Sequence, residues 1–146
     1  MTAPVVVGVD GSEGSRHALE WAIGEARTRN APLRVVRCEP SHVGVQVSGA
    51  GAAVHFMDDV DLQALKDESI VLLDRVRLAG ASTRGIDVEV EAVGAPPVEE
   101  LIRRSADAQL VVVGSRGNGW LSHLGHASVV TAVTRHAKCP IVVVPG

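Results

Sequence analysis

Four short apolar runs rich in β-branched residues divide the chain, and they constrain its fold more than any other feature. They are bounded by Pro, Gly or Asp, and longer segments with helical periodicity lie between them. Runs this short and this continuously apolar are typical of strands buried on both faces of a parallel sheet. The predicted strands are Val5–Val9, Leu33–Val36, Leu110–Val113 and Ile141–Val144.

A fifth strand is predicted for Ile86–Val93, where apolar and acidic residues alternate. Ile86 and Val88 would share one face of this strand, and Asp87 and Glu89 the other. A strand with such alternation has one wetter face, so we expect it at an edge of the sheet.

Helical patterns occupy the segments between the strands. The first begins after Ser12, a residue type favoured at helix N-caps, and its apolar stripe runs from Ala18 to Ala26. The others are predicted from about Leu62 to Gly80, from Pro96-Pro97 onward, and over Ser128–Ala137. The last is rich in valine, but the parallel strands beside it require a crossover, which favours a helix. The order βαβαβαβαβ predicts a doubly wound α/β fold with helices on both faces of a parallel sheet.

One segment, Glu39–Met57, has little periodicity and is predicted to be a long mobile loop. It contains Ser48-Gly49-Ala50-Gly51, and loops of this length are usually functional or disordered. The chain has 146 residues and no internal repeat. Residues 1–146 are therefore predicted to form a single domain.

The composition argues against several classes of function. Lys and Arg number 14 against 17 Asp and Glu, and aromatic residues are only 2% of the chain, so the basic surface and stacking platforms of nucleic-acid-binding proteins are missing. No run reaches the ~18 apolar residues of a membrane span, and the start of the sequence lacks a signal-peptide pattern. Cys38 and Cys139 lie far apart and are expected to be reduced core residues. We therefore expect a soluble, cytoplasmic protein that binds neither nucleic acid nor membranes.

Two turns that follow predicted strands carry candidate binding residues. Asp10-Gly11-Ser12 follows the first strand, and Gly114-Ser115-Arg116-Gly117-Asn118-Gly119 follows the fourth. Doubly wound sheets bind ligands beyond the carboxyl ends of the strands, where the strand order reverses. If these two strands are neighbours, both turns line one crevice, in which glycines let backbone N–H groups approach a phosphate.

Other groups could complete such a crevice. A helix that begins near Ser128 would add its N–H groups and the positive end of its dipole. Asp10 could hold a metal ion or a ribose hydroxyl. The alternative is that the glycines only form tight turns and that Asp10 caps the first helix.

Several motifs, in this order, resemble the universal stress protein family. They are Val7–Ser12, Gly94-Ala95-Pro96, Gly114–Gly117 and the ending His136–Val144. The resemblance spans the whole chain, loop lengths included. It implies a Rossmann-like, adenine nucleotide alpha hydrolase-like fold whose five parallel strands, numbered along the chain, have the order 3-2-1-4-5. It also implies ATP, or another adenine nucleotide such as cyclic AMP, as the ligand, because many members bind ATP through G-x2-G-x9-G-(S/T).

The family pattern can be placed on this chain residue by residue. Gly114 and Gly117 match its first two glycines and Ser128 its final Ser/Thr, whereas Ala127 stands at the third glycine and Val130 where members often have a second Ser. The resemblance implies that adenosine lies beside Asp10 and the backbone edge at Arg37 and Cys38. Slow ATP hydrolysis would require Asp10 to hold Mg²⁺ near the phosphates. The implied phosphate site comprises Gly114, Arg116, Gly117, Gly119, Ala127, Ser128 and Val129.

No catalytic dyad or triad is evident, since neither Ser115 nor Ser128 lies in a Gly-x-Ser-x-Gly elbow. We therefore expect a nucleotide-binding sensor or adaptor of the stress response, with an unidentified protein partner. A nucleotide-free interaction module, which Ala127 and Val130 favour, and a weak ATPase are the alternatives.

A homodimer is expected through residues 141–144. This apolar run contains no Lys or Glu, and an outer strand of that kind is an aggregation hazard unless it is covered. Pairing with the same strand of a second copy around a two-fold axis would satisfy both edges, and the family resemblance implies the same arrangement.

Overall fold

Five parallel strands form the centre of the structure, in the order predicted above. The computed structural model describes residues 2–10, 12–39, 45–48, 51–54, 71, 74, 85–115 and 126–146. The parallel strands are β1 (Val5–Val9), β2 (Leu33–Glu39), β5 (Val88–Gly94), β6 (Leu110–Gly114) and β7 (Ile141–Val144). Their order across the sheet is β5-β2-β1-β6-β7, which is 3-2-1-4-5 when the five are numbered along the chain.

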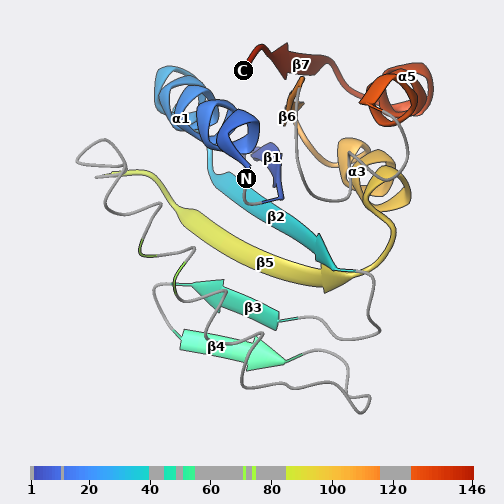
Figure 1. Cartoon of the computed structure of the whole chain (residues 1–146). Helices are drawn as coiled ribbons and strands as arrows, with labels where there is room; N and C mark the ends of the chain where they lie inside the picture. The colour runs from blue at the N-terminus through green and yellow to red at the C-terminus, as the bar shows by residue number, and fades with distance from the viewer. Residues whose placement is uncertain are drawn as a thin grey trace.

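Helices cover both faces of this sheet (Figure 1). On one face α1 (Glu13–Thr28) packs over β1 and β6, and on the other lie α3 (Pro97–Ser105) and α5 (His126–His136). Ser12 caps α1 as expected, because its hydroxyl accepts a hydrogen bond from the Ser15 amide. The helix predicted from Leu62 to Gly80 lies almost entirely outside the described residues.

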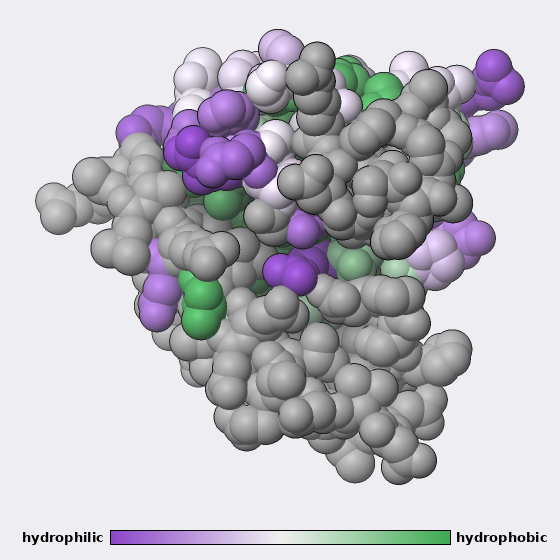
Figure 2. Space-filling model, in the orientation of Figure 1, coloured by the Kyte–Doolittle hydropathy of each residue, from purple (hydrophilic) through white to green (hydrophobic). Residues whose placement is uncertain are grey.

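Burial differs between the centre and the edge of the sheet. β1 and β6 are buried along their whole length, whereas the residues of β7 are half-buried or exposed. β7 has a single described neighbour, β6, and Figure 2 shows apolar surface at the top of the view, where Figure 1 places β7. Among the described residues this edge of the sheet is therefore apolar and unpaired, and we call it the open edge.

The prediction of a long loop over Glu39–Met57 is wrong. Two antiparallel strands, β3 (Val45–Ser48) and β4 (Gly51–Val54), lie within it and extend the sheet to seven strands. Their register pairs Ser48 with Gly51, so the connection has two residues. The sequence signal was Gly49-Ala50 between the two runs, since glycine suits the first position of a two-residue hairpin. The runs are too short, and the second too rich in Gly and Ala, for periodicity to reveal them.

The prediction of an edge position for Ile86–Val93 is wrong as well. β5 pairs with β2 on one side and with β3 on the other. The acidic residues that suggested a wet edge instead form ion pairs on the face that α3 partly covers, Glu89 with Arg34 and Glu91 with Arg104. Charged partners across the sheet, rather than solvent at an edge, account for the alternation.

Two further sequence expectations can be compared with the described residues. Cys38 is buried, Cys139 is half-buried, and the two do not form a disulfide with each other. No described helix is both long enough and apolar enough to cross a membrane.

Candidate functional site

The ends of two central strands create the candidate site. β1 and β6 are parallel neighbours, with Val5 opposite Leu110 and Val7 opposite Val112, so their carboxyl ends lie at the same edge. β2, the next strand along the chain, lies on one side of β1, and β6, which comes later, lies on the other side. The strand order therefore reverses between β1 and β6. A doubly wound sheet binds its ligands at such a point.

Asp10 stands directly after β1, and only one of its carboxylate oxygens is used. Oδ1 accepts hydrogen bonds from the Ser12 amide at 2.9 Å and the Ser12 hydroxyl at 2.5 Å. Oδ2 is buried and has no hydrogen-bond partner among the described residues. A buried polar atom without a partner costs free energy of about 1–3 kcal/mol, so Oδ2 calls for a donor or a cation that the described residues do not provide.

Asp10 does not cap α1, contrary to the alternative reading of the sequence. Ser12 is the cap, with its hydroxyl accepting from the Ser15 amide at 3.2 Å, while Asp10 holds the Ser12 hydroxyl in place. The local sequence thus fixes the carboxylate and leaves one oxygen available.

Gly114, at the end of β6, has a packing role that the sequence did not reveal. A Cβ atom added there would lie 2.7 Å from the carbonyl oxygen of Gly14 in α1. The first turn of α1 therefore rests directly against the end of β6 and fills that side of the strand ends. We infer that a ligand at this edge must lie toward α3 and α5.

Arg37 and Cys38 lie near the end of β2, next to the end of β1. Arg37 is opposite Val9, the last residue of β1. Cys38 packs in the cluster beneath α3, so by the alternation of a strand the Arg37 side chain lies on the α1 face. Both residues have interactions of their own. The structure therefore places the backbone, rather than one face of side chains, next to the candidate site.

The remaining predicted residues are only partly described. Ala127, Ser128 and Val129 lie in the first turn of α5, which begins at His126, two residues earlier than predicted. Arg116, Gly117 and Gly119 lie outside the described residues. Val130, which stands where relatives often have Ser, packs against the core cluster beneath α3 and α5.

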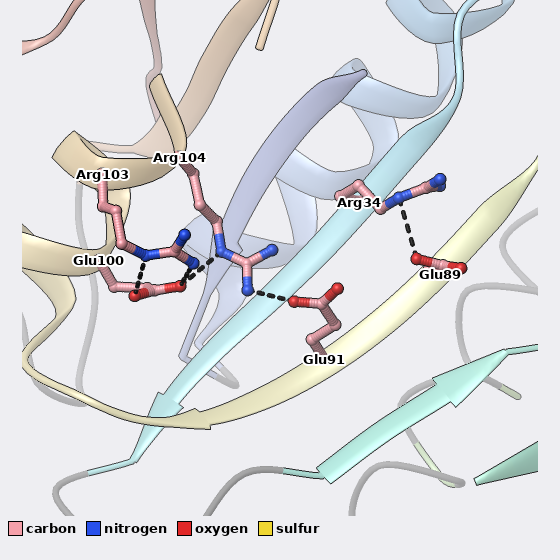
Figure 3. A network of polar contacts seen from close by, with 6 residues as sticks. All are labelled: Arg34, Glu89, Glu91, Glu100, Arg103 and Arg104. Carbon is pink, nitrogen blue, oxygen red and sulfur yellow. Dashed lines mark hydrogen bonds and ion pairs between the residues drawn. The ribbon is translucent and has the colours of Figure 1, made fainter. Parts of the chain in front are cut away.

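Sequence reasoning missed an ionic network that holds α3 on the sheet (Figure 3). Glu100 of α3 accepts from Arg103 at 2.6 Å and from Arg104 at 2.7 Å, and Arg104 also pairs with Glu91 of β5. The Glu100 side chain is only 6% exposed. Burial raises the pKa of its carboxyl, but hydrogen bonds from the two arginines outweigh burial and leave that pKa below its ordinary value.

The network affects the candidate site because it fixes the position of α3. α3 begins at Pro97, three residues after the end of β5, so the contacts that hold α3 also hold the turn between them at the carboxyl edge of the sheet. The spacing of Glu100, Arg103 and Arg104 is a helical signal, but the partner on β5 cannot be identified without the fold.

Two cavities lined by described residues lie away from Asp10. One, of about 430 Å³, lies at the amino-terminal edge of the sheet and includes Arg27, Asn30 and Asp87. The other, of about 300 Å³, is bordered by Arg34, Glu91 and Arg104. Their arginines Arg34 and Arg104 are already ion-paired.

Comparisons with known proteins agree with the fold. The model of the universal stress protein family matches residues 1–145. A universal stress protein of Mycobacterium tuberculosis is 37% identical over 143 residues, which are 97% of this chain and 45% of that protein. The chain thus spans less than half the length of the curated relatives that it matches.

Solved structures show the same architecture. A universal stress protein in complex with cAMP is 25% identical with a TM-score of 0.66, and the match covers 99% of this chain and 97% of that one. The universal stress protein of Archaeoglobus fulgidus in complex with dAMP is 24% identical with a TM-score of 0.62, covering 97% and 96%.

Together, the strand order and the Asp10 turn at its reversal point define a doubly wound α/β protein of the Rossmann-like class. Within that class, the family match and the relatives establish that the chain belongs to the universal stress protein family.

Proposed function

We propose that this protein binds an adenine nucleotide at the carboxyl ends of β1 and β6. The observation that carries the proposal is the buried Oδ2 of Asp10, which has no partner among the described residues. A ribose hydroxyl or a hydrated Mg²⁺ would satisfy this oxygen. The complexes of structural relatives with cAMP and dAMP support an adenine nucleotide as the ligand class.

The other proposed contacts follow the same geometry. The base would lie along the backbone edge at Arg37 and Cys38, which adjoins Asp10 through the pairing of Val9 with Arg37. The phosphates would lie by Gly114 and the N-terminus of α5, where backbone N–H groups and the helix dipole favour anions. Arg116, Gly117, Gly119, Ala127, Ser128 and Val129 complete the proposed phosphate site. Mg²⁺, held by Asp10, would neutralise phosphate charge there.

Adenine nucleotides with Mg²⁺ are expected to raise the melting temperature. Ligand at 100 times its Kd adds about 2.7 kcal/mol, which corresponds to roughly 5–10 °C for a chain of this size. Asp10→Asn should lose most of this shift. The unliganded variant should melt no lower than the wild type, because an amide oxygen can still accept from Ser12 and a buried unpaired charge is removed.

Asp107→Asn is the matched control, since this exposed carboxyl follows α3 far from the site. It should keep the full ligand-induced shift. The proposal is wrong if neither ATP nor cyclic AMP at millimolar concentration shifts the wild type, or if Asp10→Asn shifts as much as the wild type does.

A nucleotide-free interaction module is the second candidate, and Val130 favours it. This residue packs with fully buried Val133 against the core instead of offering a hydroxyl near the start of α5. Denatured, dialysed protein that shows no absorbance maximum at 260 nm, together with the absence of any melting shift, would favour this candidate.

We further propose that the protein acts as a homodimeric sensor or adaptor of the stress response, paired through β7. The hydrogen bonds of β7 support this pairing. Pro140 and Val144 direct their carbonyl oxygens at β6, where they accept from Val111 at 3.1 Å and Ser115 at 2.9 Å. Because backbone groups alternate along a strand, Ile141 and Val143 direct their N–H and C=O groups outward.

Val143→Pro is expected to convert the dimer to a folded monomer. The substitution removes an outward N–H group and crowds a partner strand, but it leaves the bonds to β6 in place. Val142→Pro is the matched control, since it removes an inward group and should lower the melting temperature instead. Light scattering should give about twice the chain mass of 15.2 kDa for the wild type. A monomeric wild type, or a Val143→Pro variant that dimerises normally, contradicts the pairing.

A further inference from the structure

Trp21 of α1 is a large apolar side chain left 39% exposed at the surface. It lies seven residues after Gly14, so the two share one stripe of the helix. Gly14 rests against Gly114 of β6. Arg29, near the end of α1, bonds to Gln109 just before β6. Trp21 is therefore on the flank of α1 that faces β6 and the open edge at β7.

The open edge itself carries apolar side chains on both faces. Val142 and Val144 pack toward the cluster beneath α1, whereas Ile141 packs toward the opposite cluster, and Val143 is 39% exposed. Trp21 and Val143, two of the exposed large apolar residues, thus flank the same edge on opposite faces of the sheet.

The outward backbone groups of β7 select one register for a two-fold pair. If Ile141 lies opposite Val143 of a second copy, both residues of each strand exchange their N–H and C=O groups, and all outward groups are used. The two-fold axis then passes beside Val142, which faces the same residue of the second copy at the closest spacing that antiparallel strands allow. This Val142 pair lies on the α1 face of the joined sheet.

The same symmetry leaves a trough above that pair. Strands lie about 4.8 Å apart and α1 lies over β1 and β6, so the two α1 helices would be roughly 20 Å apart. A helix with its side chains is about 10–12 Å wide, which leaves roughly 8–10 Å between them. Valine side chains form the floor of this trough, and one Trp21 lies on each wall.

We propose that the two Trp21 side chains close this trough and form the second part of the dimer interface. This inference rests on the β7 pairing proposed above and adds a contact between residues more than 100 positions apart in the sequence. Burying an indole removes a large apolar surface from water, and tryptophan is enriched among the residues that dominate interfaces. Because this surface adjoins β7, whose outward N–H and C=O groups match those of the same strand around a two-fold axis, its occupant is a second copy of the same chain.

Dilution of a Trp120→Phe variant provides the first test. The chain has two tryptophans, so Trp21 alone emits in this variant. Its emission is expected to be blue-shifted and poorly quenched by iodide at micromolar concentration. On dilution below the dimer Kd the emission should shift to the red, in step with the change in mass measured by sedimentation.

Trp21→Ala provides the second test and is expected to raise the dimer Kd at least about tenfold. Arg27→Ala, which removes an exposed side chain from another face of α1, should leave the Kd unchanged. A wild type that is monomeric overturns the β7 pairing itself. A wild-type dimer whose Kd is unaffected by Trp21→Ala, and whose Trp21 emission does not change on dilution, overturns only the role of Trp21.

Discussion

Gly114→Ala is expected to lower the free energy of unfolding by about 3 kcal/mol, at the upper end of what overpacking costs. The added methyl group would lie 2.7 Å from the Gly14 carbonyl oxygen and 3.3 Å from the Ser15 amide nitrogen. These are backbone atoms of α1, which cannot rotate away as a flexible side chain could. Relief requires the first turn of α1 to move away from β6.

Gly24→Ala is the matched control for this prediction. Gly24 is also in the described structure, but a Cβ atom there meets nothing within 4 Å, and alanine is favoured over glycine in a helix by about 0.5–1 kcal/mol. The two Gly→Ala changes should thus have opposite signs in urea or thermal unfolding. A Gly114→Ala variant as stable as the wild type would show that the contact between α1 and β6 is not close in solution.

Because Asp10 and Ser12 lie just before the displaced turn, Gly114→Ala should also weaken any nucleotide binding. A variant that binds nucleotide normally would separate the packing role of Gly114 from the site.

Glu100→Gln is expected to destabilise the protein by about 2–4 kcal/mol. The substitution removes the anion that two arginines share and leaves their charges partly uncompensated; Arg104 is only 13% exposed. Breaking one partner of a buried ion pair is much more costly than breaking an exposed one. Equilibrium unfolding at neutral pH measures the loss.

The Glu100 effect should depend on pH in a defined direction. The pKa of Glu100 in the folded state lies below its ordinary value of 4.5, so the folded state binds this proton less readily than the unfolded state. The stability that the carboxylate contributes is complete above the unfolded pKa and is lost as the pH falls through the folded pKa. The difference between wild type and Glu100→Gln should therefore shrink as the pH falls below about 4.5.

Glu13→Gln is the control, because its pairing with Arg16 is exposed on both sides, 79% and 55%. Pairs of this kind contribute little, and the variant should differ from the wild type only slightly at any pH. If Glu100→Gln behaved like Glu13→Gln, the network would not hold α3 to the sheet.

Much of the fold followed from local patterns. The five parallel strands and the helices α1, α3 and α5 were predicted near their observed positions, because burial on both faces or along one stripe leaves its period in the sequence. The hairpin β3–β4 was not, because two runs of four residues, the second rich in Gly and Ala, carry too little periodic signal. The glycine turn at Arg116, Gly117 and Gly119 lies outside the described residues, and its role stays a prediction.

The sequence by itself determined the five parallel strands, the helices α1, α3 and α5, the start of α1, and which turns follow the central strands, since each depends on neighbours along the chain. Only the tertiary structure decided that β5 is an interior strand and that Glu100 pairs with two arginines. It also showed that the lack of a side chain at Gly114 lets the backbone of α1 pack against the end of β6. It alone revealed that Oδ2 of Asp10 is buried without a partner among the described residues. Each of these features depends on burial and on contacts between elements, such as the contact of Gly14 with Gly114. Contacts between residues far apart in the sequence produce no periodic pattern of apolar residues, so the sequence alone does not reveal them.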